Sequence, residues 1–278
     1  MFGKILDKPF IFWSVLFTLI PLCLIVFFCF TTSPFGLDQV DYSFSLENLQ
    51  KVFEPMYMKI MLKSFQLALI ATVICLLLGY PLAYKIANTS MKWQQVMVML
   101  VVVPMWMNFL LRTYAWLLIL GTNGYFNMFL DFIGLPKIEI LFTDAAVVLG
   151  MVYNFLPFMV LPIFTVLRKM DNKLVDAAKD LGATDSVVFR RIIFPLSIPG
   201  IVSGVSMVFM PAASTFVISS LLGGGQYMLI GNLIEEQFMR IGDWHFGSAL
   251  SIILMIFILI SMIIMNKYDS DEGSSGLW

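Results

Sequence analysis

The chain of 278 residues has few of the side chains that build most catalytic and metal sites. Its one histidine is His245, so we expect no histidine-based catalytic triad and no multi-histidine metal site from this chain alone. The three cysteines, Cys23, Cys29 and Cys75, lie in apolar runs without a CxxC pair, which is typical of small hydrophobic residues facing lipid or core. The sequence therefore predicts neither a metal site nor catalytic residues.

Phosphate and nucleic-acid binding also lack support. No GxxxxGK[ST] motif occurs, and no lysine follows the run Gly223, Gly224 and Gly225, which predicts a flexible loop rather than a phosphate site. Charged residues make up 13% of the chain, against about 25% in soluble proteins. The 17 basic residues nearly balance the 18 acidic ones, so no excess of positive charge points to nucleic acid.

Apolar residues are abundant instead. They make up 60% of the chain, whereas soluble proteins contain roughly 45–50%. A helix needs about 20 apolar residues to cross the hydrocarbon layer of a membrane. Six runs meet this requirement, at 10–30, 60–84, 94–118, 145–167, 199–222 and 248–266. The sequence therefore predicts an all-α, polytopic membrane protein with six transmembrane helices.

The distribution of basic residues predicts the orientation. If both termini are on the inner side, 11 of the 17 basic residues are also inside. Only Lys51, Lys59, Lys63, Arg112, Lys137 and Arg240 are then outside. Because positive charge favours the cytoplasmic side, we expect both termini in the cytoplasm and a multi-pass protein of the plasma membrane.

The segments between the spans predict one membrane domain over residues 1–278, with core spans at about 60–266. In the second outer segment, Phe126, Phe129, Leu130 and Ile133 recur at helical spacing, which predicts a short helix on the membrane surface. The tail at 267–278 is acidic and then rich in glycine and serine, so we expect it to be disordered.

The inner segment 168–198 is too polar to span a membrane. Asp171 is a suitable cap for a helix over 172–181, and Gly182 is suited to end that helix in the left-handed conformation. A second helix is expected to run to Phe194 and stop before Pro195. Such a pair of helices either lies on the lipid headgroups or docks against a cytoplasmic partner.

The small side chains of this loop favour docking, since a membrane-bound helix needs larger apolar groups. The run Asp176, Ala177, Ala178, with Gly182, then nine residues and Ile192 to Pro195, resembles the EAA motif of ABC importer permeases. Asp176 stands where that motif has glutamate, and Phe194 where it has leucine. The resemblance implies a coupling helix that docks on an ATPase subunit through Asp176, Ala177, Ala178, Gly182, Ile192 and Pro195.

A second resemblance extends over nearly the whole chain. The segments at 54–57, 79–83, 103–108, 156–160, 229–232 and 243–247 are similar to the PotB-type permeases of spermidine/putrescine importers. This implies a type I permease domain with a companion permease as heterodimer, two ATPase subunits and an extracytoplasmic polyamine-binding protein. It also implies that this chain has no cofactor of its own, because ATP and Mg²⁺ bind to the ATPase.

Polar and aromatic side chains near prolines are the candidates for a substrate path. No aspartate or glutamate lies in any of the six runs. A polyamine would therefore meet aromatic faces, hydroxyls and amides, and a cation–π contact is worth roughly 0.5–2 kcal/mol. The candidates are Trp106, Asn108, Tyr153, Asn154, Ser214 and Thr215. The alternative for the asparagines is a hydrogen bond between helices, and for the hydroxyls a contact that holds helices together.

Several charged residues are expected at the outer side of the membrane. Arg112 is expected near the outer headgroups, where its side chain can extend to the surface, and it would repel a polycation. Glu235, Glu236 and Asp243 are outer-face candidates for attracting cations or docking an outside partner, the alternative being a solvated loop. The rival functions are the same importer class for another small solute and, less favoured without intramembrane acids or internal repeats, a secondary transporter.

Overall fold

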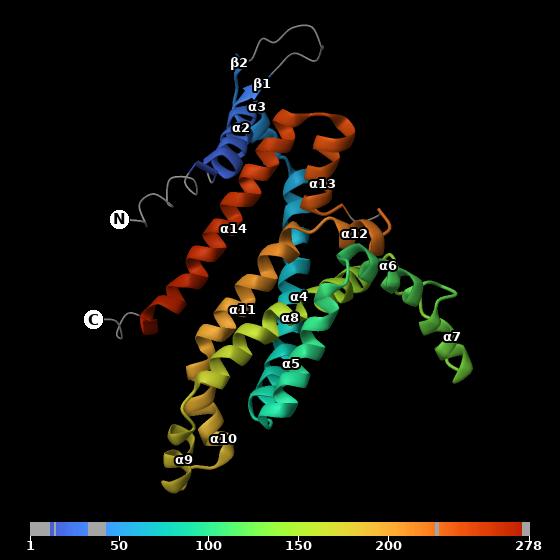
Figure 1. Ribbon diagram of the computed structural model, residues 1–278. Coiled ribbons are helices and arrows are strands. Elements are labelled where there is room, and N and C mark those ends of the chain that lie inside the picture. The colour runs from blue at the N-terminus through green and yellow to red at the C-terminus, as the bar shows by residue number, and fades with distance from the viewer. Residues whose placement is uncertain (1–11, 14, 33–42, 226–227, 274–278) are drawn as a thin grey trace. The chain divides into compact units, whose positions relative to one another are not determined.

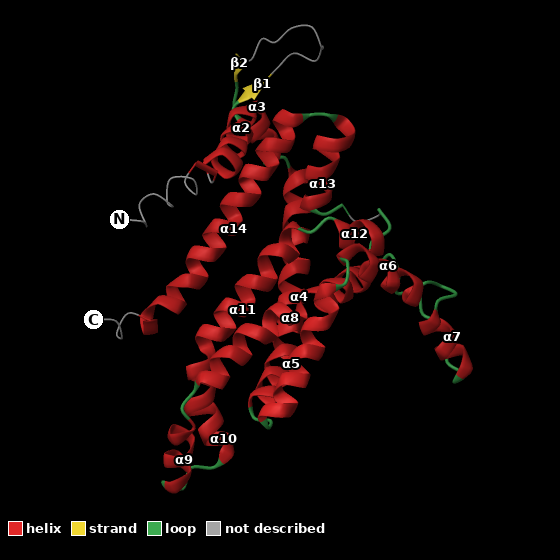
Figure 2. Cartoon of the chain, viewed as in Figure 1, coloured by secondary structure: helices red, strands yellow, loops and turns green. Residues whose placement is uncertain are grey.

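The structure is a computed structural model that describes residues 12–13, 15–32, 43–225 and 228–273. It is almost entirely helical in this part of the chain (Figure 2). The chain divides into two compact units, one made of Met1–Leu62 with Leu229–Leu259 and the other of Lys63–Met228 with Ile260–Trp278. Each unit is described by itself.

The first unit contains the N-terminal apolar helix and the segment Leu229–Leu259. Its elements are a π-helical turn Val15–Leu19, α2 (Ile20–Cys29), β1 (Thr31–Thr32), β2 (Ser43–Phe44), α3 (Glu47–Val52), α13 (Ile230–Glu236), a π-helical turn Gln237–Ile241 and the beginning of α14 (Trp244–Gly273). The two short strands pair antiparallel, with Thr31 opposite Phe44.

Phe246 is the centre of packing in this unit and is fully buried. The Tyr57 ring lies 4.9 Å from the Phe246 ring, and the Lys51 ammonium lies 4.5 Å from its centroid on the face. The neighbouring His245 donates from Nδ1 to the Phe28 carbonyl at 3.1 Å. His245 thus ties the start of α14 to the end of α2, as a structural contact.

The second unit contains the remaining helices (Figure 1). They are most of α4 (Pro55–Ala87), α5 (Met91–Trp106), α6 (Phe109–Leu120), α7 (Tyr125–Phe132), α8 (Asp144–Lys169), α9 (Asn172–Asp180), α10 (Asp185–Val188), a π-helical turn Phe189–Ile193, α11 (Phe194–Ser214) and α12 (Val217–Leu222). In α7, Tyr125, Phe129 and Phe132 are exposed. Its place on a membrane surface stays a prediction.

Of the six predicted runs, up to five correspond to helices that are long and apolar enough to cross a membrane. Four continuous helices are long and apolar enough to cross a membrane, at Pro55–Ala87, Asp144–Lys169, Asp185–Ser214 and Trp244–Met265. A fifth candidate is a bent pair, and the shorter apolar helix Val15–Cys29 falls in the first predicted run. The chain is thus an all-α, polytopic membrane protein. Helix α14 runs to Gly273, into the tail predicted to be disordered from residue 267, because residues 267–272 contain neither proline nor glycine.

The third predicted span, 94–118, is wrong as a continuous helix. Helix α5 ends at Trp106, and the direction changes by 93° before α6 continues. Met107 has extended backbone dihedrals, and the Asn108 side-chain oxygen accepts from the amides of Leu110 at 2.8 Å and Leu111 at 3.4 Å. Asparagine therefore starts a new helix where apolar composition alone predicts continuation.

The fifth predicted span, 199–222, also needs correction at both ends. The helix does not stop before Pro195, because a π-helical turn at Phe189–Ile193 carries it from α10 into α11. A wider turn accommodates a proline that lacks an N–H. At the other end, α11 stops at Ser214, Thr215 is extended, and α12 begins at Val217.

Helices α8 and α11 form the main packing contact of the second unit. Two glycines of α11, Gly200 and Gly204, face α8 at four-residue spacing, which permits close approach of two backbones. A Cβ on Gly204 would lie 2.8 Å from the Met159 sulfur and 3.1 Å from the Met159 carbonyl oxygen. A Cβ on Gly200 would lie 3.0 Å from the Ile163 Cα.

Gly204→Val is expected to force α8 and α11 apart. Overpacking of a tight contact typically costs about 1–3 kcal/mol. We predict a lower unfolding temperature of the purified protein in detergent, while Met207→Val, at an exposed position of the same helix, leaves it nearly unchanged. Equal unfolding temperatures for Gly204→Val and the native chain would contradict this close packing.

Candidate coupling loop and translocation residues

The loop between α8 and α11 forms the predicted pair of short helices. Asp171 caps α9, because its Oδ1 accepts from the Lys173 amide at 3.0 Å. Gly182 has a φ of 82°, in the left-handed region predicted for it, and α10 follows. Figure 1 shows α9 and α10 projecting beyond the ends of α8 and α11. The loop is therefore a helical hairpin at one end of a long helix pair.

An ion pair crosses the bend of this hairpin. The Lys179 ammonium lies 2.9 Å from Asp185 Oδ1. The hydrogen bond and charge of Asp185 raise the pKa of Lys179 above its ordinary value of 10.5. Lys179 therefore remains charged at neutral pH and loses its proton only as the pH rises through that raised pKa.

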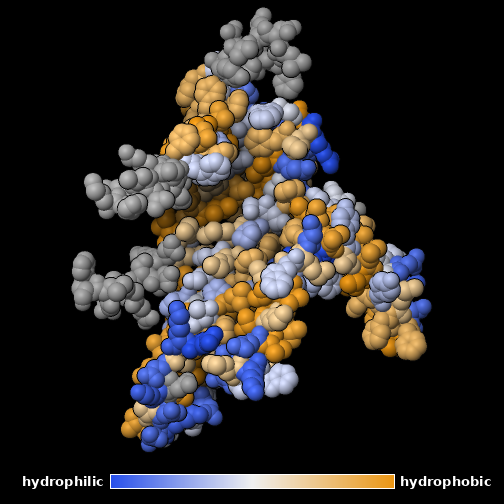
Figure 3. All heavy atoms as spheres, viewed as in Figure 1, coloured by the Kyte–Doolittle hydropathy of each residue, from blue (hydrophilic) through white to orange (hydrophobic). Residues whose placement is uncertain are grey.

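The motif residues fall into two groups. Asp176, Ala177 and Gly182 are exposed on the hairpin, and Leu181 beside them is 89% exposed. Figure 3 shows hydrophilic residues gathered around α9 and α10. Ala178 is half-buried, and so are Ile192 and Pro195, which lie where the hairpin joins α11. The hairpin thus has an exposed surface, and its base is packed against the helices.

An aromatic cluster that the sequence reasoning missed holds that base. Phe189 packs edge-on against Tyr80 at 5.9 Å and Tyr84 at 5.7 Å, both from α4. The Phe194 ring lies 6.0 Å from Tyr80, whose hydroxyl is 3.0 Å from the Ser197 hydroxyl. The only trace of this cluster in the sequence is the aromatic pair Phe189 and Phe194, at the start of the π-helical turn and directly after it. These contacts join the base of the hairpin to α4.

Trp106 and Asn108 lie at the break between α5 and α6. Trp106 is 76% exposed and lines a cavity of about 290 Å³ along α5 and the C-terminal part of α8. The other residues lining this cavity are Gln94, Gln95, Val98, Met99, Val102, Phe164 and Arg168. Asn108 uses its side-chain oxygen as the cap of α6. Trp106 is therefore the more available of the two for a substrate.

Tyr153 and Asn154 lie on α8. The Tyr153 ring packs edge-on against Trp116 of α6 at 5.3 Å and is 37% exposed. Asn154 is buried and donates to the Gly150 carbonyl at 2.9 Å, a bond within α8 rather than the hydrogen bond between helices considered as its alternative. Its Oδ1 has no hydrogen-bond partner among the described residues.

Ser214 and Thr215 lie at the break between α11 and α12. Ser214 donates to the Met210 carbonyl at 3.1 Å. The half-helix α12 packs on α6 and on α8, where Ile218 and Leu222 are the nearest neighbours of Gly150. Four path candidates thus lie at two helix breaks, and the half-helices that follow these breaks are in contact.

The outer-face candidates lie in the first unit. Glu235 and Glu236 end α13 and are half-buried. Asp243 accepts from the Phe246 amide at 3.0 Å and so acts as a cap for α14.

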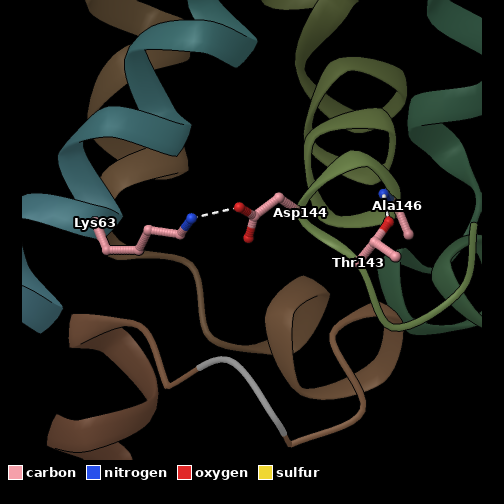
Figure 4. Close-up of polar contacts among 4 residues, drawn as sticks. All are labelled: Lys63, Thr143, Asp144 and Ala146. Carbon is pink, nitrogen blue, oxygen red and sulfur yellow. Dashed lines mark hydrogen bonds and ion pairs between the residues drawn. The ribbon is translucent and has the colours of Figure 1, made fainter.

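An ion pair that sequence reasoning missed joins Lys63 of α4 to Asp144 at the start of α8, where Thr143 caps the helix by accepting from Ala146 (Figure 4).

This ion pair lies at one end of a mostly apolar groove. The groove runs between α4 and α8 and has a volume of about 540 Å³. Within the described part of the chain, no group of three histidine, cysteine or acidic residues could hold a metal ion.

Long apolar helices, two broken spans and a projecting helical hairpin define a membrane transport subunit. Residues 76–271 match the family of binding-protein-dependent transport system inner membrane components. The chain belongs to this family, so it is a multi-pass protein of the inner membrane and a transport subunit rather than an enzyme.

Its relatives include spermidine/putrescine transport system permease proteins PotB. The chain is 41% identical to that of Salmonella typhimurium (strain LT2) over 268 residues, 93% of each chain. It is 41% identical to that of Escherichia coli (strain K12) over 254 residues, 91% of this chain and 92% of the relative. It is 38% identical to that of Haemophilus influenzae over 273 residues, 98% of this chain and 94% of the relative.

Solved structures show the same fold. A bacterial ABC transporter involved in the import of the acidic polysaccharide alginate aligns with a TM-score of 0.80 at 15% identity, over 96% of this chain and 94% of that chain. The MetNI methionine ABC transporter in inward-facing conformations aligns with a TM-score of 0.59 at 16% identity, over 77% of this chain and 96% of that chain. The fold is that of type I ABC importer permeases.

Asn108→Ala is expected to loosen the start of α6. Loss of a side-chain cap costs about 1 kcal/mol, so amide hydrogen exchange at Leu110 and Leu111 should become several-fold faster in detergent micelles. Asn108→Asp keeps the accepting oxygen and should restore slow exchange. Unchanged exchange in Asn108→Ala would show that the side chain does not hold this helix start.

Proposed function

We propose that this chain is one permease subunit of an ATP-driven polyamine importer. It pairs with a companion permease, and both dock on a dimer of ATPase subunits that bind ATP and Mg²⁺. An extracytoplasmic binding protein delivers spermidine or putrescine. The substrate class is supported by the relatives at 38–41% identity, which are spermidine/putrescine transport system permease proteins. The hairpin with its exposed Asp176, Ala177 and Gly182 carries the coupling role.

Continuous helix is the feature that supports mechanical coupling. From Asp185 to Ser214 the chain is one helical run of 30 residues that joins the hairpin to the helix break at Thr215. A push on the hairpin by the ATPase is therefore transmitted along α11 to that break. Because α8 packs tightly on α11, α8 moves together with α11. The path then opens alternately to the two sides of the membrane.

The chemistry of the path candidates suits a weakly held polycation. The last carbonyls of α5 and α11 lack partners within their own helices, and helix C-termini favour cations. Trp106 adds an aromatic face close to one such end. Such contacts bind weakly enough for release, and tight capture is left to the binding protein. We also propose that both termini and the hairpin lie in the cytoplasm, as the distribution of basic residues predicts.

Gly182→Val tests the coupling role. Valine in the left-handed region costs roughly 1–2 kcal/mol, so the hairpin should lose its bend. In proteoliposomes containing the assembled complex and its binding protein, spermidine stimulation of ATP hydrolysis should fall about tenfold. Gly134→Val is a matched control, because Gly134 also has a positive φ of 75° with open space around it but lies outside the hairpin.

Full stimulation in Gly182→Val, with assembly verified, would refute the coupling role of the hairpin. No response to spermidine or putrescine in the native assembled complex, but a response to another solute, would refute the polyamine assignment and leave the importer class intact.

Trp106→Ala tests the path. Loss of a cation–π contact should lower ATP-dependent spermidine uptake between about two- and thirtyfold, and Trp106→Phe should lower it less. Trp93→Ala is the control, since Trp93 lies at the other end of α5 and is similarly exposed. Equal uptake by Trp106→Ala and Trp93→Ala would remove Trp106 from the path.

A further inference from the structure

We infer that Arg112 is a charge barrier that keeps cations from leaking through the proposed path when the importer is idle. This inference rests on the proposed function, because it takes the break between α5 and α6 as part of the path. It assigns to Arg112 a role in selectivity rather than in substrate binding.

The burial of Arg112 is the first observation. The residue is only 8% exposed, so its side chain is folded into the protein and does not extend to the headgroups as expected from the sequence. Its Nε and Nη1 are buried and have no hydrogen-bond partner among the described residues. A buried guanidinium without a counter-charge is costly in a membrane protein and usually marks a functional site.

The elements packed around α6 do not supply a counter-charge. They are α7, α8 and α12. The acid of α7, Asp131, is exposed. The acid at the start of α8, Asp144, pairs with Lys63 through Oδ2, and its buried Oδ1 has no hydrogen-bond partner, Arg112 included, among the described residues. Helix α12 contains no acidic residue. The nearest compensation recorded in the described part of the chain is the Phe109 ring, 5.9 Å from the Arg112 guanidinium carbon.

The position of Arg112 is the second observation. It lies in the first turn of α6, and its amide donates to the Asn108 carbonyl at 3.2 Å. The negative end of the α5 dipole and the positive end of the α6 dipole both point to this break, and their charges of about half a unit oppose each other. The full positive charge of Arg112 therefore sets the sign of the potential near the break. In other membrane pores an arginine, or the positive ends of half-helices, excludes cations.

A path for polycations gains from such a barrier. Weak aromatic and carbonyl contacts alone would let potassium or protons pass whenever the path is briefly open to both sides of the membrane. A buried charge acts strongly because little water screens it. The ATP-driven movement of α11 and α8 reaches α6 through α12, so the barrier is coupled to the transport cycle.

The test measures leak without ATP in proteoliposomes that hold the complete complex. In Arg112→Met the potassium leak should rise at least about tenfold over the native complex, while the leak of neutral glycerol stays unchanged. Arg112→Lys keeps the charge and should keep the potassium leak low. Thr113→Val is the packing control, because Thr113 is also buried in α6 but carries no charge.

Three results would overturn the inference. The first is a potassium leak in Arg112→Met equal to that of the native complex. The second is a parallel rise of the glycerol leak, which indicates loosened packing. The third is loss of assembly in Arg112→Met and Arg112→Gln but not in Arg112→Lys, which indicates a paired arginine. Potassium leak does not depend on the transported solute. Failure of the polyamine assignment is therefore seen separately, as absence of ATP-dependent spermidine uptake by the native complex.

Discussion

The close approach of α8 and α11 at Gly200 and Gly204 is the contact on which the second unit depends. Where Gly204 meets Met159, there is no room for a side chain on α11. Helix α8 also contacts α5, α6 and α12, so it connects all the broken helices to the helix that carries the hairpin. A rigid pair of this kind can transmit movement from the hairpin without losing its own packing.

The proposed mechanism combines this helix pair with the two helix breaks. Irregular backbone in a membrane is tolerated only where it is buried in protein or lines a cavity. At Met107 and at Thr215 the chain leaves helical geometry, and polar side chains and carbonyls become available within apolar surroundings. In the proposed mechanism, movement of a half-helix at these two points changes access to the path from the two sides of the membrane.

The sequence predicts the apolar helices and the hairpin well, because both depend on local patterns. Asp171 caps the start of α9, and Gly182 follows its end in the left-handed region, as expected from helix capping. The breaks were missed because hydropathy is the same on both sides of them, and prolines do not distinguish them. Pro157 and Pro162 lie within continuous α8, whereas Pro104 and Pro211 shortly precede the breaks. The burial of Arg112 and the Lys63–Asp144 pair depend on tertiary packing, which no local pattern encodes.

The most direct test of the account is accumulation of radiolabelled spermidine in proteoliposomes that contain this chain, its companion permease and the ATPase subunits. With the binding protein outside and ATP available to the ATPase, we predict accumulation above the external concentration, which putrescine lowers by competition and a non-hydrolysable ATP analogue abolishes. Accumulation that persists without ATP hydrolysis, or that follows an imposed ion gradient instead, would contradict the account.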